Sequence, residues 1–208
     1  MKKDLLSDSK KALIAYGKME SYSIQEDILQ RLVKDYPDHT NKAAVEVKVK
    51  LLNLFYSTYI LATNRMTEHI LGINNIDARL KKGDKSLVEE IAKLTIGSKT
   101  YNLYSFATKY CAYHNPEAFP IYDNIVAKVL TKLNTGKETD KAFEKKLRDY
   151  ASYIQIYDTF MKDYGLWGHL TYRQVDAYLW GAYKVAGDDF EIEKLAPLDK
   201  SKIVEVKV

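Results

Sequence analysis

The chain has 208 residues, enough for a domain with a sizeable hydrophobic core that needs no disulfide or metal for stability. Hydrophobic residues make up 46% and charged residues 29%, and these typical values exclude a disordered or fibrous chain. The 32 basic and 28 acidic residues give a net charge of +4, which permits binding to an acidic polymer without demonstrating it.

Cysteine and histidine usage argues against a disulfide or a metal site. The single cysteine, Cys111, cannot form an intramolecular disulfide, and no cysteines and histidines have zinc-ligand spacing. We therefore expect no metal and no other cofactor. A lone cysteine suits a reducing compartment, and charged residues interrupt the N-terminal stretch before a signal peptide could form, so the predicted location is cytoplasmic.

The longest apolar stretch, around residues 51–62, is about a dozen residues long, well short of the roughly 20 needed to cross a bilayer. It is typical of a buried helix, and no membrane association is expected.

Long stretches with few glycines or prolines carry apolar residues three and four positions apart, which predicts an all-α fold. Two amphipathic helices are expected first, over residues 4–19 and 24–33. Residues 42–62 are the most apolar and are predicted to form a central helix, the hub of the core. A short helix capped by Asn64 and stopped by Gly72 follows.

Glycines divide the middle of the chain. Gly83 and Asp84 predict a turn and a cap before a helix over residues 86–94. Gly97 predicts a second break, before a helix over residues 101–115. The order expected in this region is therefore helix, glycine turn, helix.

A prolyl link and three helical regions complete the predicted fold. Pro116 and Pro120 bracket an extended link that leads to a helix over residues 124–133. Further helices are expected near residues 141–160 and 171–185.

The charged tail after residue 187 ends in IVEVKV, whose alternation predicts a short strand or an ordered terminal extension. No repeat of fixed period and no long linker marks a domain boundary. We therefore predict one compact all-α domain over residues 1–187, with room for two lobes around a central cleft, and a C-terminal extension over residues 188–208.

Tyrosine is unusually frequent, at 17 residues. A tyrosine can fill a core while its hydroxyl finds a hydrogen-bond partner, or it can stack on a nucleobase in an open groove. Many of these tyrosines fall on apolar helical stripes, which favours the core.

The least generic segment is residues 105–130, in which Asp123 closely follows Pro120 at the start of a helix. One interpretation is an N-cap, in which the carboxylate bonds the first backbone amides of the helix. The other is a carboxylate that faces a cleft and stabilises a developing cation or orients a water.

Residues 87–130 resemble the core of the helix-hairpin-helix DNA glycosylase superfamily, the group that includes 8-oxoguanine glycosylases. The resemblance rests on the glycine turn LTIGSKTY between two helices and on the link and helix FPIYDNIVAKVL. It implies a hairpin at Gly97 that holds the DNA backbone and a catalytic aspartate at Asp123. Members that also nick the strand use a lysine nucleophile, for which Lys99 in the turn and Lys109 in the next helix are the candidates.

The same resemblance implies that double-stranded DNA is the partner and that a base is flipped into a cleft lined by tyrosines. Tyr104 and Tyr122 are the candidate tyrosines. His114 either bonds an edge of the substrate or caps its helix. The lysine would attack C1′ of the sugar while the aspartate stabilises the sugar cation, which makes the protein a DNA N-glycosylase.

Other interpretations remain open. Lys109 also fits a structural role, with its charged end reaching water from an apolar helix face. The whole chain could be a non-catalytic binding or scaffold protein that keeps the glycosylase-like fold. A catalytic domain for another nucleotide or a small ligand is the third alternative.

Overall fold

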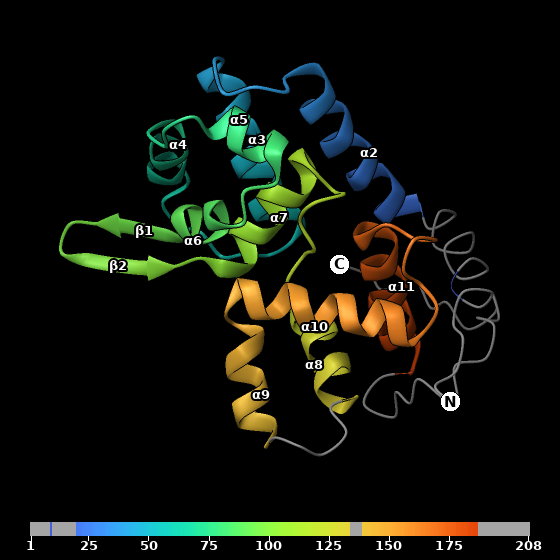
Figure 1. The fold of residues 1–208 in the computed structure, drawn as a ribbon. Helices are drawn as coiled ribbons and strands as arrows, with labels where there is room; N and C mark the ends of the chain where they lie inside the picture. Colours follow the sequence, from blue (N-terminus) through green and yellow to red (C-terminus); the bar gives the residue numbers. More distant parts are fainter. Residues whose placement is uncertain (1–8, 10–19, 134–138, 187–208) are drawn as a thin grey trace. The chain divides into compact units, whose positions relative to one another are not determined.

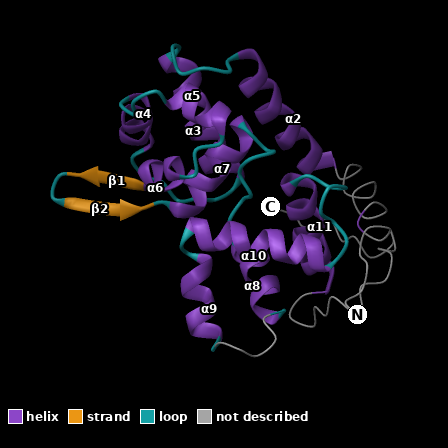
Figure 2. Ribbon diagram, in the orientation of Figure 1, coloured by secondary structure: helices purple, strands orange, loops and turns teal. Residues whose placement is uncertain are grey.

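The computed structural model describes residue 9, residues 20–133 and residues 139–186. The helix expected over residues 4–19 and the tail after residue 187 lie outside these ranges. The described part is mostly helical, which confirms the predicted class, and it adds one two-stranded sheet (Figures 1 and 2).

The chain divides into two compact units. The first unit is Ile24–Tyr122, and the second is Met1–Ser23 together with Asp123–Val208. One domain over residues 1–187 with an extension after it stays a prediction.

The first unit is built from helices and one hairpin. Its helices are α2 (Glu20–Asp35), which begins just before the unit boundary, α3 (Lys42–Phe55), α4 (Thr63–Leu71), α5 (Ile76–Lys82), α6 (Ser86–Ala92) and α7 (Tyr104–His114). Helix α7 packs against α3, α5 and α6, and α3 packs against α4. The core contains side chains that are at most 1% exposed, including Val45, Val49, Met66, Ile70, Leu87, Ile91 and Phe106.

Helix α3 ends at Phe55, so the prediction of one helix through residue 62 is wrong beyond that point. Ser57 and Tyr59 have φ values of +46° and +57°, which no α-helix accommodates. The side chain of Asn53 accepts a hydrogen bond from the Ile60 amide at 2.8 Å and donates one to the Ile60 carbonyl at 3.0 Å. This side chain replaces helical bonds and fixes the turn, which periodicity does not reveal.

The ends of the short helices α4 and α5 lie at the glycines that predicted them. Gly72 follows α4 as predicted, although α4 starts at Thr63 without a side-chain cap, so Asn64 does not cap it. Gly83 ends α5 with φ +74°, a conformation that favours glycine. The Asp84 carboxylate accepts a bond from the Ser86 amide at 3.1 Å, which confirms the predicted turn before α6.

The region around Gly97 is a β-hairpin. Strands β1 (Lys93–Ile96) and β2 (Lys99–Asn102) are antiparallel, and Ile96 lies opposite Lys99. Gly97 and Ser98 therefore form a two-residue loop, and Gly97 has the positive φ, +61°, that the first position of a type II′ turn requires. The predicted order of helix, glycine turn, helix is wrong here, because the residues on either side of Gly97 pair as strands.

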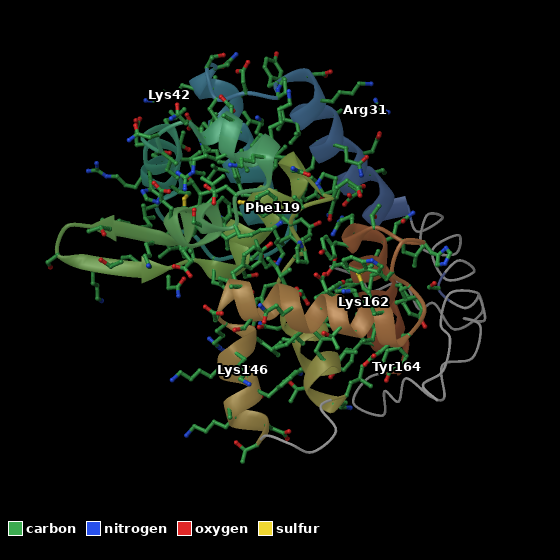
Figure 3. The ribbon with its side chains drawn as sticks, viewed as in Figure 1. Arg31, Lys42, Phe119, Lys146, Lys162 and Tyr164 are labelled. Atoms are coloured by element: carbon green, nitrogen blue, oxygen red, sulfur yellow. The ribbon has the colours of Figure 1, made fainter. Side chains whose placement is uncertain are left out.

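The predicted prolyl link is present, since residues 115–123 belong to no helix. Its start is fixed by the side chain of Asn115, whose Nδ2 donates to the Leu80 carbonyl in the last turn of α5 at 2.9 Å. In its middle, the ammonium of Lys85 donates to the Ala118 carbonyl and lies 4.6 Å from the ring of Phe119 (labelled in Figure 3). Phe119 is only 1% exposed, so the link is anchored in the core.

In its described part, the second unit consists of α8 (Asn124–Lys132), α9 (Asp140–Leu147), α10 (Tyr150–Asp163) and α11 (Tyr172–Ala186), with α8 packed against the other three. Asp149 separates α9 from α10 and caps α10 by accepting a bond from the Ser152 amide at 2.8 Å. Three tyrosines of α10, Tyr150, Tyr153 and Tyr157, are at most 2% exposed. These tyrosines have the predicted core role.

Candidate functional site

Lys109 lies on α7 with its side chain directed into the first unit. It is 2% exposed. Its Nζ donates to the Ser105 hydroxyl at 2.7 Å and to the Tyr122 carbonyl at 3.1 Å. It also lies 5.3 Å from the centre of the Tyr56 ring, within cation–π range. Lys109 is therefore a buried amine at the end of the prolyl link, where the glycosylase resemblance places a candidate nucleophile.

Side chains of α7 bind both the amide and the carbonyl of Tyr122. Thr108 Oγ1 accepts a bond from the Tyr122 amide at 3.1 Å, and the Ser105 hydroxyl donates to the Tyr122 carbonyl at 3.3 Å. The rings of Tyr104 and Tyr122 are 4.8 Å apart. The structure thus brings together three of the predicted site residues, Lys109, Tyr122 and Tyr104. Ser105 and Thr108 complete the group, and sequence reasoning did not single them out.

Asp123 begins the second unit and is the N-cap of α8. Its carboxylate accepts a bond from the Ile125 amide at 2.8 Å. The structure therefore agrees with the capping interpretation. Asp123 is half-buried, so part of the residue is exposed to solvent. The catalytic role stays a prediction.

Lys99 and Gly97 lie on the hairpin and are exposed. A Cβ added at Gly97 would meet nothing within 4 Å, so the tip of the hairpin is open. Strand β2, which carries Lys99, directly precedes α7 in the chain. The roles of both residues in DNA contact stay predictions.

His114, at the last position of α7, belongs to a second cluster. Its ring stacks on His39 with centroids 5.1 Å apart and lies 5.0 Å from the ring of Tyr110. It makes a hydrogen bond to the backbone of Pro37, and because proline has no N–H, the ring donates to the carbonyl. The His114 Nε2 atom is buried and has no partner among the described residues. The ring therefore does not cap its own helix.

His39 links three elements. Its Nδ1 lies 2.5 Å from Asp77 Oδ1 on α5, and its Nε2 lies 2.7 Å from the Tyr110 hydroxyl on α7. A neutral ring with the proton on Nδ1 donates to Asp77 and accepts from Tyr110, which satisfies all three groups. Burial lowers the pKa of His39, against the opposing effect of Asp77, and burial also raises the pKa of Tyr110.

Lys48 on α3 is the cation of this cluster. It is 1% exposed, and its ammonium donates to the Tyr36 carbonyl and to the Asp38 carbonyl. Burial lowers the pKa of Lys48 to about 8. Burial, followed by the charges of Lys48 and His39, holds the pKa of His114 well below its usual range.

His114 is the member of this second cluster that was predicted from the sequence. Asp77 and Tyr110 are 38 and 71 residues away from His39, so only the packing of the corresponding helices brings these three side chains together. No local signal in the sequence marks His39 or Asp77.

A hollow of about 120 Å³ lies beside α3 and α4 and is lined by Lys42, Glu46, Asn64, Thr67 and Glu68. None of the site residues predicted from the sequence lines it. Across the ranges that the structure describes, no three histidine, cysteine or acidic side chains are grouped so as to hold a metal ion. No helix in those ranges is both long enough and apolar enough to span a bilayer.

This chain is similar to one protein family and to a bacterial protein. Residues 8–118 match the family described as HI_0787_N, N-terminal domain. A protein of Haemophilus influenzae (strain ATCC 51907 / DSM 11121 / KW20 / Rd), described as an uncharacterized protein, is 40% identical over 132 residues. That match covers 64% of this chain and 62% of the relative, less than two thirds of its length. No solved structure matches the chain.

Proposed function

The chain belongs to the HI_0787_N N-terminal domain family, and within that family we propose that it binds DNA and acts on a flipped base in the manner of helix-hairpin-helix DNA glycosylases. The observation that carries the proposal is the buried amine of Lys109, held by Ser105 and by the carbonyl of Tyr122. This group lies in the segment whose sequence resembles those enzymes.

In the proposed reaction, the neutral Nζ of Lys109 attacks C1′ of the target nucleotide. The C1′–N bond breaks, its electron pair leaves with the base, and the base receives a proton that Nζ gives up. The C1′–O4′ electron pair then moves to O4′, which water protonates, and an iminium remains between Nζ and C1′. The resemblance gives Asp123 the role of stabilising positive charge on the sugar.

Reduction with borohydride tests this proposal, because it converts the iminium to a stable amine that joins protein to DNA. We expect the full chain to form a covalent adduct with a duplex that contains one abasic site. Since Lys109 is 2% exposed, adduct formation also shows that the amine becomes accessible. The yield should fall to background for Lys109→Gln.

Lys99→Gln is the matched control, because Lys99 is exposed on β2 and is the other candidate nucleophile. An adduct that persists in Lys109→Gln and disappears in Lys99→Gln moves the nucleophile to the hairpin. A wild-type chain that neither forms an adduct nor binds duplex DNA at low salt rejects the proposal.

A non-catalytic binding protein is the second candidate, and the turn after α3 favours it. Asn53 fixes a turn that leaves two large apolar side chains, Tyr59 and Leu61, 84% and 101% exposed. A non-glycine residue with positive φ, such as Tyr59, is strained, and such strain is concentrated at functional sites. Exposed tyrosines in fixed conformations are typical of protein-binding surfaces.

The second candidate is tested with Tyr59→Ser, which removes an exposed ring. Any partner that binds the wild-type chain through this turn should lose at least tenfold in affinity, about 1.4 kcal/mol. Trp167→Ser is the control, since Trp167 is 44% exposed and lies in the second unit. Equal affinity of the two variants argues against a role for the turn.

A further inference from the structure

The loop between α2 and α3, residues 36–41, is held by side chains from three other helices, and we call it the corner loop. Lys48 of α3 binds the carbonyls of Tyr36 and Asp38, and His114 of α7 binds the backbone of Pro37. His39 of the loop binds Asp77 of α5 and Tyr110 of α7. Four consecutive loop residues are therefore each fastened to the helical core.

These contacts depend on neutral imidazoles. His39 can accept the Tyr110 proton only while its Nε2 is unprotonated. The His114 ring already donates to Pro37, so a second proton would go to its buried Nε2, which has no acceptor among the described residues. A protonated His114 would also stack 5.1 Å from His39 and face the Lys48 ammonium.

Charged groups from two helices and from the loop itself face the two rings. Lys48 comes from α3, Asp77 from α5, and Asp38 from the loop itself. Asp77 favours a charged His39, but its side chain is 47% exposed, while that of His39 is 5% exposed. Water screens the attraction, whereas burial penalises the charge in full.

We propose that the corner loop is an acid-sensitive latch, in which protonation of His39 and His114 releases the loop and the adjoining end of α2 from α3, α5 and α7. At neutral pH the latch is closed. Protonation turns the accepting Nε2 of His39 into a donor, adds an unpartnered donor at the buried Nε2 of His114, and places two further positive charges beside Lys48. The device is independent of the reaction proposed above, because it concerns the contacts of the corner loop and not the amine of Lys109.

The direction of the pH effect follows from linkage. Both histidines have lowered pKa values in the folded chain. Below pH 6.5, the usual pKa of histidine, the open state therefore binds more protons than the closed state. The closed state is therefore stable above pH 6.5 and loses stability as the pH falls toward the folded pKa values. Each histidine changes the opening equilibrium by up to about tenfold per pH unit in that interval.

Amide hydrogen exchange of the full chain measures the opening. We expect peptides from α2 and the corner loop to lose at least about tenfold in protection between pH 7 and pH 5, with labelling times scaled to the intrinsic exchange rate. Peptides from α10, in the second unit, should keep their protection. An equal loss in both sets indicates global unfolding and rejects the latch, as does protection that is independent of pH.

His114→Phe keeps a ring against His39 and Tyr110 but cannot take up a proton, so the pH-dependent loss should be smaller in this variant. His169→Gln is the control, because His169 is exposed and lies in the second unit. If His114→Phe does not fold, nuclear magnetic resonance titration of the wild-type imidazoles decides. The proposal requires His39 and His114 to titrate below pH 6.5 and is rejected if they titrate at or above it.

Discussion

At the scale of single residues, Asp123 has a structural role that must be separated from its proposed chemistry. Its carboxylate caps α8, and an N-cap contributes about 1 kcal/mol. Asparagine caps about as well as aspartate. We therefore expect Asp123→Ala to lower the free energy of unfolding by about 1 kcal/mol and Asp123→Asn to change it little.

Urea unfolding of both variants checks the cap, and the borohydride reaction checks the chemistry. A folded Asp123→Asn chain with a normal yield of adduct would contradict a catalytic carboxylate. A large loss of stability in Asp123→Asn would instead mean that the negative charge itself stabilises the helix.

The sequence predicted this cap because an N-cap is a local feature: the aspartate precedes the helix that it caps. His39 could not be found in the same way. Its partners, Asp77 and Tyr110, are 38 and 71 residues away, and a lone histidine in a polar stretch carries no signal. Residues whose roles depend on long-range packing become visible only in the folded chain.

At the scale of elements, Gly83 and Gly97 form a natural pair for measuring backbone strain. Both have positive φ, but a Cβ at Gly83 would lie 2.7 Å from the Cβ of Ala118, whereas one at Gly97 would meet nothing within 4 Å. We expect Gly97→Ala to cost about 1 kcal/mol from strain alone. Gly83→Ala should cost about 2–4 kcal/mol, since close contact adds to strain.

The difference is measured by chemical unfolding followed by circular dichroism. Equal costs for the two variants would show that the prolyl link, which carries Ala118, moves freely to accommodate a methyl group. That outcome would also contradict the anchoring of the link by Phe119.

Two elements differ from the sequence prediction for identifiable reasons. The hairpin differs from the prediction because the break at Gly97 was interpreted as a turn between two helices, although two short runs flank the dipeptide Gly-Ser, which is a hairpin signal. The early end of α3 had no such signal, because the Asn53 side chain sets it through bonds to Ile60. Turns made by side chains compete with helices in ways that apolar spacing does not report.

At the scale of the whole molecule, the two units can be followed separately in one chain. Both tryptophans, Trp167 and Trp180, lie in the second unit, so fluorescence follows that unit while circular dichroism follows both. We expect the two probes to give unfolding curves that do not coincide. Coincident curves, in the wild type and in Gly83→Ala, would mean that the chain unfolds as one cooperative body.

The division into units also limits what family membership implies. The family match ends at residue 118, just before the first unit ends at Tyr122. It therefore includes Lys109, the corner loop and the hairpin, while Asp123 lies beyond it. The predicted all-α class holds in both units, because helical periodicity is strong throughout, but periodicity carries no information on where one unit ends.

The open tip of the hairpin has a practical consequence. Cys111 is the single cysteine of the chain, it is fully buried, and burial raises the pKa of its thiol, so it is unreactive toward alkylating reagents. Ser98 is exposed at the turn, so Ser98→Cys would add one exposed thiol there. A single substitution therefore yields a chain that carries one fluorophore at a defined position, suited to anisotropy measurements without further cysteine replacement.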